Sequence, residues 1–96
     1  MNNEPQMPSN TPPGSAWFRR SDGQRRVAVQ VTPANRPQIA AWVGGDPWGA
    51  GVAVPTPDGG EIRAPVGSWI VTRPDGWWAI WPADTFRAAW RAEVTT

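Results

Sequence analysis

The sequence predicts an α+β fold: a small, mostly antiparallel sheet of about five strands with two short helices. Three patterns lead to this prediction. Apolar and polar residues alternate over segments of strand length. Pro-Asp-Gly turns at 57–59 and 74–76 separate such segments. Two further stretches, near 37–43 and 85–94, place apolar residues at helical spacing. We expect both helices to cover the same face of the sheet.

The clearest strand is 27–31, in which three valines alternate with Ala28 and Gln30. A short strand is expected before it, at 17–20. After the first helix and a loop at 46–51, the remaining strands follow in close succession. They are expected at 51–56, 61–66, 68–72 and 77–81.

The first helix is expected between two residues that suit helix ends. Asn35 suits the N-cap, Pro37 is tolerated in a first turn, and Gly44 suits the position after the last turn. The apolar stripe of this helix consists of Ile39, Trp42 and Val43.

The second helix is expected after Asp84, which can act as its N-cap. Its apolar stripe consists of Phe86, Ala89, Trp90 and Val94, with Arg87 and Arg91 outside. Both helices are therefore expected to pack on the sheet through tryptophan-containing stripes, which makes Trp42 and Trp90 core residues.

Composition separates the chain into two parts. Residues 1–16 are polar and rich in proline, which predicts a disordered arm. Residues 17–96 are expected to form a single domain. A domain of this size buries only about 60% of its unfolded surface, so we expect a homodimer or a higher homo-oligomer. No segment has the apolar length of a membrane span, so no membrane contact is expected.

The amino-acid inventory favours binding over catalysis. Tryptophan supplies 8 of the 96 residues, whereas histidine, cysteine, tyrosine and lysine are absent. The chain therefore lacks the usual general base, the commonest metal ligand and a thiolate nucleophile. Neither Ser68 nor Glu61 has an activating partner, so we expect no enzyme activity and no metal or other cofactor. Indole rings and guanidinium groups remain as the strong contact groups.

Trp77 and Trp81 are the first candidates for ligand contact. By strand alternation, Trp78 and Ile80 face the core, and Trp77 and Trp81 lie together on the open face or at its rim. Two indoles on one face of a strand, four residues apart in sequence, can hold a planar ring. The alternative is that they form a dimer interface, or that the N-terminal arm and Trp17 cover them.

Two further tryptophans are candidates. Trp48 lies in a glycine-flanked loop, where it can serve as a lid or an anchor for a ligand or partner, or instead as a plug over the core. Trp69 lies on the strand next to Trp77 and Trp81. It is expected to belong to the core and is retained as a candidate ligand contact.

All basic residues are arginines, and four of them cluster around one turn. This cluster of Arg19, Arg20, Arg25 and Arg26 is a candidate for phosphate contact, joined by Arg63 and Arg73 from the sheet and its hairpin. Arg25 and Arg26 are the members retained as candidate site residues. The alternative is a solvated basic loop. The net charge is only +1, so nucleic acid is not expected as a partner. A single nucleotide-like anion requires only two or three arginines.

The C-terminal half contains Gly67-Ser68-Trp69-Ile70-Val71, then Gly76, then Asp84-Thr85-Phe86 and Trp90. In order and spacing, these residues resemble the motifs of a family of small proteins encoded by tailed bacteriophages and prophages. In that family Gly-Asp-Trp-Ile-Ile precedes Gly-Glu-Phe-Tyr-Pro and Pro-Asp-Ile-Phe. The resemblance covers about residues 26–94.

The chain departs from the family at two acidic positions. Ser68 replaces the usual aspartate and Trp77 the usual glutamate, while Trp81 stands where cysteine is frequent. No role of those carboxylates is carried over to this chain. The resemblance implies the fold and a viral, non-virion accessory protein that acts in the host bacterial cytoplasm.

We therefore expect a non-enzymatic phage accessory protein that binds and sequesters a nucleotide-like small molecule. A cyclic nucleotide or an ADP-ribose derivative that signals host defence is the expected ligand. The alternative from another class is a protein-binding inhibitor or structural interaction module, with exposed tryptophan and arginine side chains as hot spots for a host protein. A further alternative assigns the surplus tryptophans to the core and a dimer interface, and leaves the function open.

Overall fold

The computed structural model describes residues 11–93 of the 96-residue chain. Within them it has two helices and eight strands. In chain order these are β1 (Ala16–Arg20), β2 (Arg25–Gln30), α1 (Arg36–Val43), β3 (Asp46–Trp48), β4 (Gly51–Pro55), β5 (Glu61–Ala64), β6 (Trp69–Thr72), β7 (Trp78–Trp81), α2 (Ala83–Ala89) and β8 (Trp90–Ala92). No helix in this part of the chain is long and apolar enough to cross a membrane.

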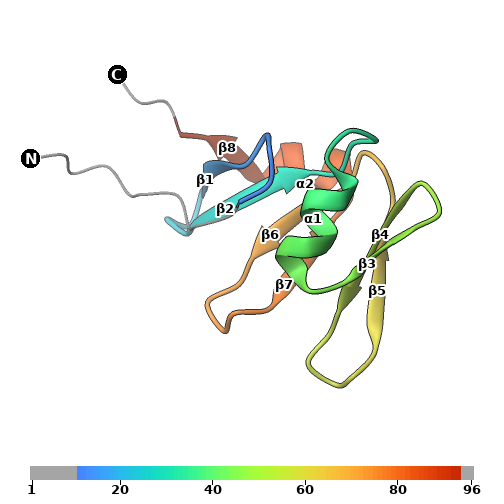
Figure 1. Cartoon of the computed structure of the whole chain (residues 1–96). Coiled ribbons are helices and arrows are strands. Elements are labelled where there is room, and N and C mark those ends of the chain that lie inside the picture. Colours follow the sequence, from blue (N-terminus) through green and yellow to red (C-terminus); the bar gives the residue numbers. More distant parts are fainter. Residues whose placement is uncertain (1–10, 94–96) are drawn as a thin grey trace, which may run out of the picture.

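The strands form two antiparallel sheets (Figure 1). The larger sheet has the order β7-β6-β2-β1-β8, and the smaller has the order β3-β4-β5. The predicted α+β class is confirmed. The second sheet differs from the single sheet that was expected, and β3 replaces an expected loop. Gly44 adopts a left-handed conformation at the end of α1, after which β3 runs antiparallel to β4.

The two helices cover opposite faces of the larger sheet, so the prediction that both cover one face is wrong. The reason lies in β2, where Val27, Ala28 and Val29 are all buried. A strand that is apolar on both sides requires cover on both faces. Alternation sends Val29 toward α1 and Ala28 toward α2.

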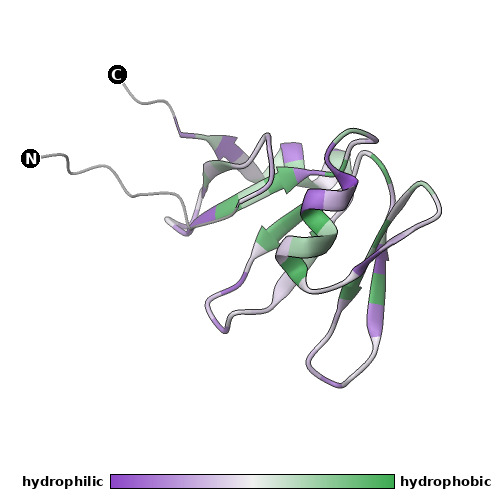
Figure 2. Cartoon of the chain, viewed as in Figure 1, coloured by the Kyte–Doolittle hydropathy of each residue, from purple (hydrophilic) through white to green (hydrophobic). Residues whose placement is uncertain are grey.

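The first core lies between α1, the smaller sheet and one face of the larger sheet. Figure 2 shows apolar residues concentrated on β2, β6, α1 and β4, where these elements meet. Trp78 and Ile80 pack against this core, as predicted, and Trp42 contacts Trp78 with ring centroids 4.4 Å apart. The buried members of this core are Val29, Val31, Ile39, Ala40, Val43, Val52, Val54, Ala64 and Ile70.

The second core lies between α2 and the other face of the larger sheet. Its buried members are Phe18, Ala28, Val71, Phe86 and Trp90, and the half-buried Trp69 and Trp81 pack against them. It is an aromatic cluster, in which most of the large side chains are indole or phenyl rings. This core brings Trp81 at the end of β7 next to Trp90 at the start of β8.

The second helix is shorter than predicted. It ends at Ala89, and Trp90 adopts an extended conformation that starts β8. Trp90 still reaches the core, but as a strand residue paired with Arg20 of β1. The N-cap position is Pro82, and Asp84 lies in the first turn, so the predicted cap is wrong. Val94 lies outside the described residues.

The first helix agrees with its prediction at both ends. Asn35 occupies the N-cap position, although its side chain makes no capping hydrogen bond. Its Oδ1 accepts from the backbone N–H of Thr32, and its Nδ2 donates to the carbonyl of Gln30. Asn35 thus ties the start of α1 to the end of β2.

The predicted arm falls partly within the described residues. Residues 1–10 lie outside them. The backbone N–H and the hydroxyl of Ser15 both donate to the carbonyl of Pro12. Pro12 is a buried residue, and β1 begins at Ala16. The described part of the predicted arm thus contains this turn at residues 12–15 and the first residue of β1.

Candidate functional site

A groove crosses the α2 side of the larger sheet, with a volume of about 270 Å³. We call it the arginine–tryptophan groove, after the side chains that dominate its walls. Its lining residues are Arg20, Gln24, Arg26, Val71, Thr72, Arg73, Pro74, Ala79, Trp81 and Trp90. They come from β1, β2, β6, β7, β8 and the turns that join them.

The groove exists because its central residues are small. Ala28, Val71 and Ala79 are paired across β2, β6 and β7, so their side chains point to the same face. Val71 and Ala79 line the groove, and the larger side chains of neighbouring rows stand around them. This row of small side chains, with tryptophan and arginine side chains on either side, leaves a depression with a positively charged rim.

Three guanidinium groups border this depression. Arg20 lies 3.8 Å from Asp22, and Arg73 donates to Asp75 at 2.6 Å. Arg26 has no carboxylate within ion-pair distance in residues 11–93, and it donates instead to the carbonyl of Arg25 at 2.7 Å. Three cations thus face two carboxylates, so the groove keeps an excess of positive charge.

The aromatic wall consists of Trp81 and Trp90, which meet edge to face with ring centroids 6.0 Å apart. The guanidinium carbon of Arg20 lies 5.6 Å from the ring of Trp81 and 5.9 Å from that of Trp90. Such cation–π contacts hold the charge over the indoles while its N–H groups remain free to donate. Trp90 is buried, and its Nε1 has no hydrogen-bond partner among the described residues.

Three of the residues singled out from the sequence lie together in this groove. Arg26, Arg73 and Trp81 come from separate strands and turns, and the sheet brings them together. Sequence reasoning placed Trp90 in the core only, and it named Arg20 in the basic cluster without retaining it as a site residue. Their proximity depends on the pairing of β1 with β8, and the helical spacing around Trp90 concealed that strand.

Trp77 does not line the groove, although it follows the same turn as Arg73. Its backbone carbonyl accepts from the N–H of Arg73 at 3.0 Å, and its own N–H donates to Asp75 at 3.0 Å. The indoles that line the groove are Trp81 and the buried Trp90, and the expected pair of Trp77 and Trp81 is not brought together there.

Trp48 and Arg63 lie together on the smaller sheet, away from the groove. The guanidinium carbon of Arg63 is 3.8 Å from the centroid of the Trp48 ring, and Trp48 is 47% exposed. Arg36 holds the adjacent turn by donating to the carbonyl of Gly51 at 3.1 Å and also to that of Gly49. This pair forms a separate exposed surface.

Arg25 is engaged in an ion pair at the β1–β8 side of the larger sheet. Its guanidinium donates two hydrogen bonds to Glu93, and it lies 5.1 Å from the ring of Trp17. The hydrogen bond from Arg25 lowers the pKa of Glu93, and the same bond raises the pKa of Arg25. Arg25 is therefore neutralised locally, unlike Arg26.

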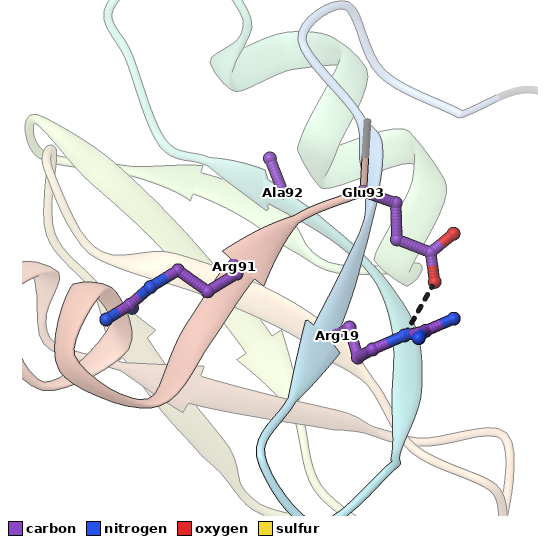
Figure 3. Close-up of a pocket in the computed structure, with 4 residues that line it drawn as sticks. All are labelled: Arg19, Arg91, Ala92 and Glu93. Carbon is purple, nitrogen blue, oxygen red and sulfur yellow. Dashed lines mark ion pairs between the residues drawn. The ribbon is translucent and has the colours of Figure 1, made fainter. Parts of the chain in front are cut away.

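The hollow beside this ion pair is lined by Arg19, Arg91, Ala92 and Glu93 (Figure 3). Arg19 lies 3.7 Å from Glu93, and Figure 3 shows the side chain of Arg91 directed away from that pair. Arg91 donates to the carbonyl of Arg87 on α2. Because a carboxylate occupies this hollow, it suits an anion less well than the groove does.

Trp69 serves the second core. Its ring stacks on Phe86 with centroids 4.1 Å apart, and it contacts Phe18 edge to face at 5.2 Å. It also borders a hollow of about 420 Å³ near Asn35 and Gln30. The side chain of Asn35 already donates to backbone carbonyls there. This hollow contains no charged lining residue.

The chemistry available in the groove is donation of hydrogen bonds, cationic charge and aromatic surface. Among residues 11–93, no three His, Cys, Asp or Glu side chains are grouped so as to hold a metal ion. The hydroxyl of Thr72, at the edge of the groove, donates to the carbonyl of Val27 at 3.1 Å. The arrangement suits an anion that also presents a flat ring.

Comparisons of the chain with protein-family models, with curated proteins and with solved structures find no match.

Proposed function

We propose that the protein binds a nucleotide-type small molecule in the arginine–tryptophan groove and sequesters it without chemical change. The observation that carries the proposal is the placement of Arg20, Arg26 and Arg73 around an indole wall. Guanidinium groups bind phosphate through paired N–H donors, and indole rings stack on bases. One site thus offers both contacts that a nucleotide needs.

The size of the groove limits the ligand. Ligand pockets usually measure about 300–1,000 Å³, and this groove lies just below that range, at about 270 Å³. It therefore suits one nucleotide unit, with any second unit of a dinucleotide or of an ADP-ribose derivative outside it. In the viral setting implied by the resemblance, a nucleotide signal of host defence is the first ligand class to test.

The available contacts set an upper limit on the affinity. A hydrogen bond to a charged group contributes about 1.5–3 kcal/mol, and a base stacked on an aromatic ring contributes about 1–3 kcal/mol. Two arginine contacts and one stack would give about 4–9 kcal/mol before the cost of association is subtracted. After an association cost of about 4 kcal/mol, at most about 5 kcal/mol remains, which corresponds to a dissociation constant of about 0.2 mM or weaker from these contacts alone.

The first experiment is a thermal-shift panel with the full chain. It would include mononucleotides, cyclic mono- and dinucleotides, ADP-ribose, the matching nucleosides and inorganic phosphate. A ligand at about 100 times its dissociation constant adds about 2.7 kcal/mol to stability, which is a shift of several degrees for a small domain. We expect nucleotides to raise the melting temperature and nucleosides to have little effect. Equal shifts from nucleosides, or a flat panel, would contradict the proposal.

A charge-removal series locates the site. Arg26→Gln is expected to weaken nucleotide binding about 10- to 100-fold, because it removes one charge-assisted contact. Arg73→Gln is expected to act in the same direction. Arg87→Gln is the matched control, since Arg87 lies on α2 outside the groove with a side chain that is 66% exposed. Equal losses in all three variants would indicate a general charge effect.

A second candidate function, binding to another protein, is supported by a different surface. Trp48 is a large apolar residue with 47% exposure, and Arg63 lies over its ring. Tryptophan and arginine are the residue types enriched in interface hot spots. This function would be favoured if the Trp48→Ala variant still bound nucleotide but no longer bound a protein partner.

A further inference from the structure

The smaller sheet ends in an open strand. One side of β5 pairs with β4, and no described strand pairs with its other side. Figure 1 shows β5 on the outer side of the smaller sheet, far from β8. The first three residues of β5, Glu61, Ile62 and Arg63, are all exposed. A free strand edge presents unpaired backbone groups that can accept another strand.

The opposite edge of this sheet carries a proline within its strand, whereas β5 does not. In β3, Pro47 lacks a backbone N–H, and a proline at an edge discourages pairing. The residues of β5 include no proline, and their two charges, on Glu61 and Arg63, are of opposite sign, so they repel a second strand only in some registers. Pro65 follows directly after the strand and limits any pairing to its four residues.

The register of β4 and β5 fixes which backbone groups point outward. The N–H of Thr56 donates to the carbonyl of Gly60 at 3.0 Å, so these two residues occupy a hydrogen-bonded position of the ladder, although the N–H of Gly60 donates to Asp58. Hydrogen-bonded and non-hydrogen-bonded pairs alternate along an antiparallel ladder. Ile62 is therefore bonded to β4, and the N–H and carbonyl groups of Glu61 and Arg63 point to the free edge.

We propose that β5 pairs antiparallel with β5 of a second copy of the chain, on a two-fold axis at Ile62. This register places Glu61 of each copy opposite Arg63 of the other, where their outward backbone groups can exchange hydrogen bonds. The side chains of Glu61 and Arg63 lie on one face of the strand, so they also meet as ion pairs. The smaller sheets of the two copies become one six-stranded sheet.

Charge selects this register over its neighbours. A two-fold axis at Arg63 would set two arginines opposite each other, and an axis at Glu61 would oppose two carboxylates. Like charges that are directly opposite destabilise a sheet. Only the axis at Ile62 pairs unlike charges twice. Arg63 is already held by Trp48 at 3.8 Å, which reduces the ordering cost of its new contact.

Exposed apolar area supports the same surface. Ile62 is 47% exposed on the face of β5 that it shares with Ala64, while Trp48, also 47% exposed, lies on the opposite face with Arg63. In the proposed dimer the two Ile62 side chains meet across the axis. A contact based on four residues per chain is smaller than a standard interface, so we expect a monomer–dimer equilibrium of modest affinity.

The test is sedimentation equilibrium of the full chain over a wide range of protein concentration, with a charge-swap series. We expect Glu61→Arg and Arg63→Glu each to raise the dimer dissociation constant about tenfold or more, because each replaces two unlike pairs by two like pairs. The double variant E61R/R63E restores unlike pairs and is expected to recover most of the affinity. Arg87→Glu, on the exposed side of α2, is the control and should leave dimerisation unchanged.

Three outcomes would overturn the proposal. They are a monomer at every concentration, a dimer that no β5 variant affects, and a double variant that dimerises no better than the single ones. The inference does not rest on nucleotide binding, since the groove lies on the other sheet. The thermal shift that a nucleotide causes in each β5 variant therefore shows whether the variant is folded and whether its groove still binds. Sedimentation shows separately whether the variant dimerises.

Discussion

The indole of Trp69 stacks on the phenyl ring of Phe86, with centroids 4.1 Å apart and planes inclined by only 6°. Trp69 belongs to β6, and Phe86 is the buried residue of α2. Phe18 of β1 contacts both rings edge to face. This three-ring contact fixes α2 on the sheet. It thereby fixes the point at which the chain leaves α2 and enters β8.

The first prediction concerns Phe86→Ala. Removing a buried phenyl ring leaves a cavity and costs about 3–5 kcal/mol of unfolding free energy. Stability of a domain this small is expected to be only about 5–10 kcal/mol, so the variant should be largely destabilised. Urea unfolding, followed by tryptophan fluorescence, measures the change. Arg87→Ala is the adjacent control and should stay within about 0.5 kcal/mol of the parent protein. A loss below about 1 kcal/mol for Phe86→Ala would contradict the packing described.

The second prediction compares two adjacent glycines after α1. Gly44 has φ of 72°, and a Cβ added there meets nothing within 4 Å, so Gly44→Ala should cost only the strain of a left-handed residue, about 1–2 kcal/mol. At Gly45, an added Cβ would lie 1.9 Å from the carbonyl oxygen of Ala53. That contact forces β4 away from the end of α1. Gly45→Ala should therefore cost about 3 kcal/mol or more.

Thermal or urea unfolding of both glycine variants provides the measurement. The expected order is fixed by geometry: Gly45→Ala is the less stable of the two. Equal stabilities, or the reverse order, would show that β4 can move away from Gly45 without penalty.

The third prediction is a dependence of stability on pH. The hydrogen bond from Arg25 lowers the pKa of Glu93 from its ordinary value of 4.5. A carboxylate with a lowered folded-state pKa stabilises the fold above its unfolded pKa, and this contribution is lost as pH falls through the folded value. Melting temperatures should be measured from neutral pH to about pH 3. We expect them to decrease once the pH is below about 4.5.

Two variants assign this acid effect to the ion pair. Glu93→Gln should lower the melting temperature at neutral pH and make its acid dependence shallower. Arg25→Gln should flatten the profile in the same way, because it removes the main partner of Glu93. Profiles that stay parallel to that of the parent protein in both variants would assign the acid sensitivity to other carboxylates.

Local patterns were enough to predict the fold class and most strand positions. The valines of β2 alternate cleanly, and Gly59 and Gly76 take the left-handed conformation that their turns require. The helix limits failed where local and long-range signals compete. Phe86, Ala89 and Trp90 have helical spacing, yet Trp90 gains backbone pairing with β1 by leaving the helix. That pairing depends on residues about 70 positions away.

The candidate site was only partly predictable for the same reason. Arginine and tryptophan were identified by residue type, and Arg26, Arg73 and Trp81 do share one groove. Arg25 was grouped with Arg26 because they are adjacent, but strand alternation sends neighbouring side chains to opposite faces. Arg25 therefore pairs with Glu93, and Arg26 borders the groove. Their adjacent positions in the sequence could not show that the two side chains have different partners.

The last prediction uses two tryptophans of β7 to test the aromatic wall. Trp81 lines the groove, whereas Trp78 is directed to the opposite face and contacts Trp42. Both are half-buried, so replacement by phenylalanine perturbs packing to a similar degree. Trp81→Phe reduces the stacking surface of the groove and should weaken nucleotide binding by about 1 kcal/mol, or about fivefold.

Trp78→Phe should leave the affinity unchanged while lowering stability by a comparable amount. Titration calorimetry at a temperature well below both melting points separates the two effects. The comparison matters because any loss of stability common to both variants cancels between them. An affinity loss in Trp81→Phe alone assigns the stacking contact to the α2 side of the sheet. A loss in Trp78→Phe alone would move the ligand to the α1 side, where the described residues place a packed core.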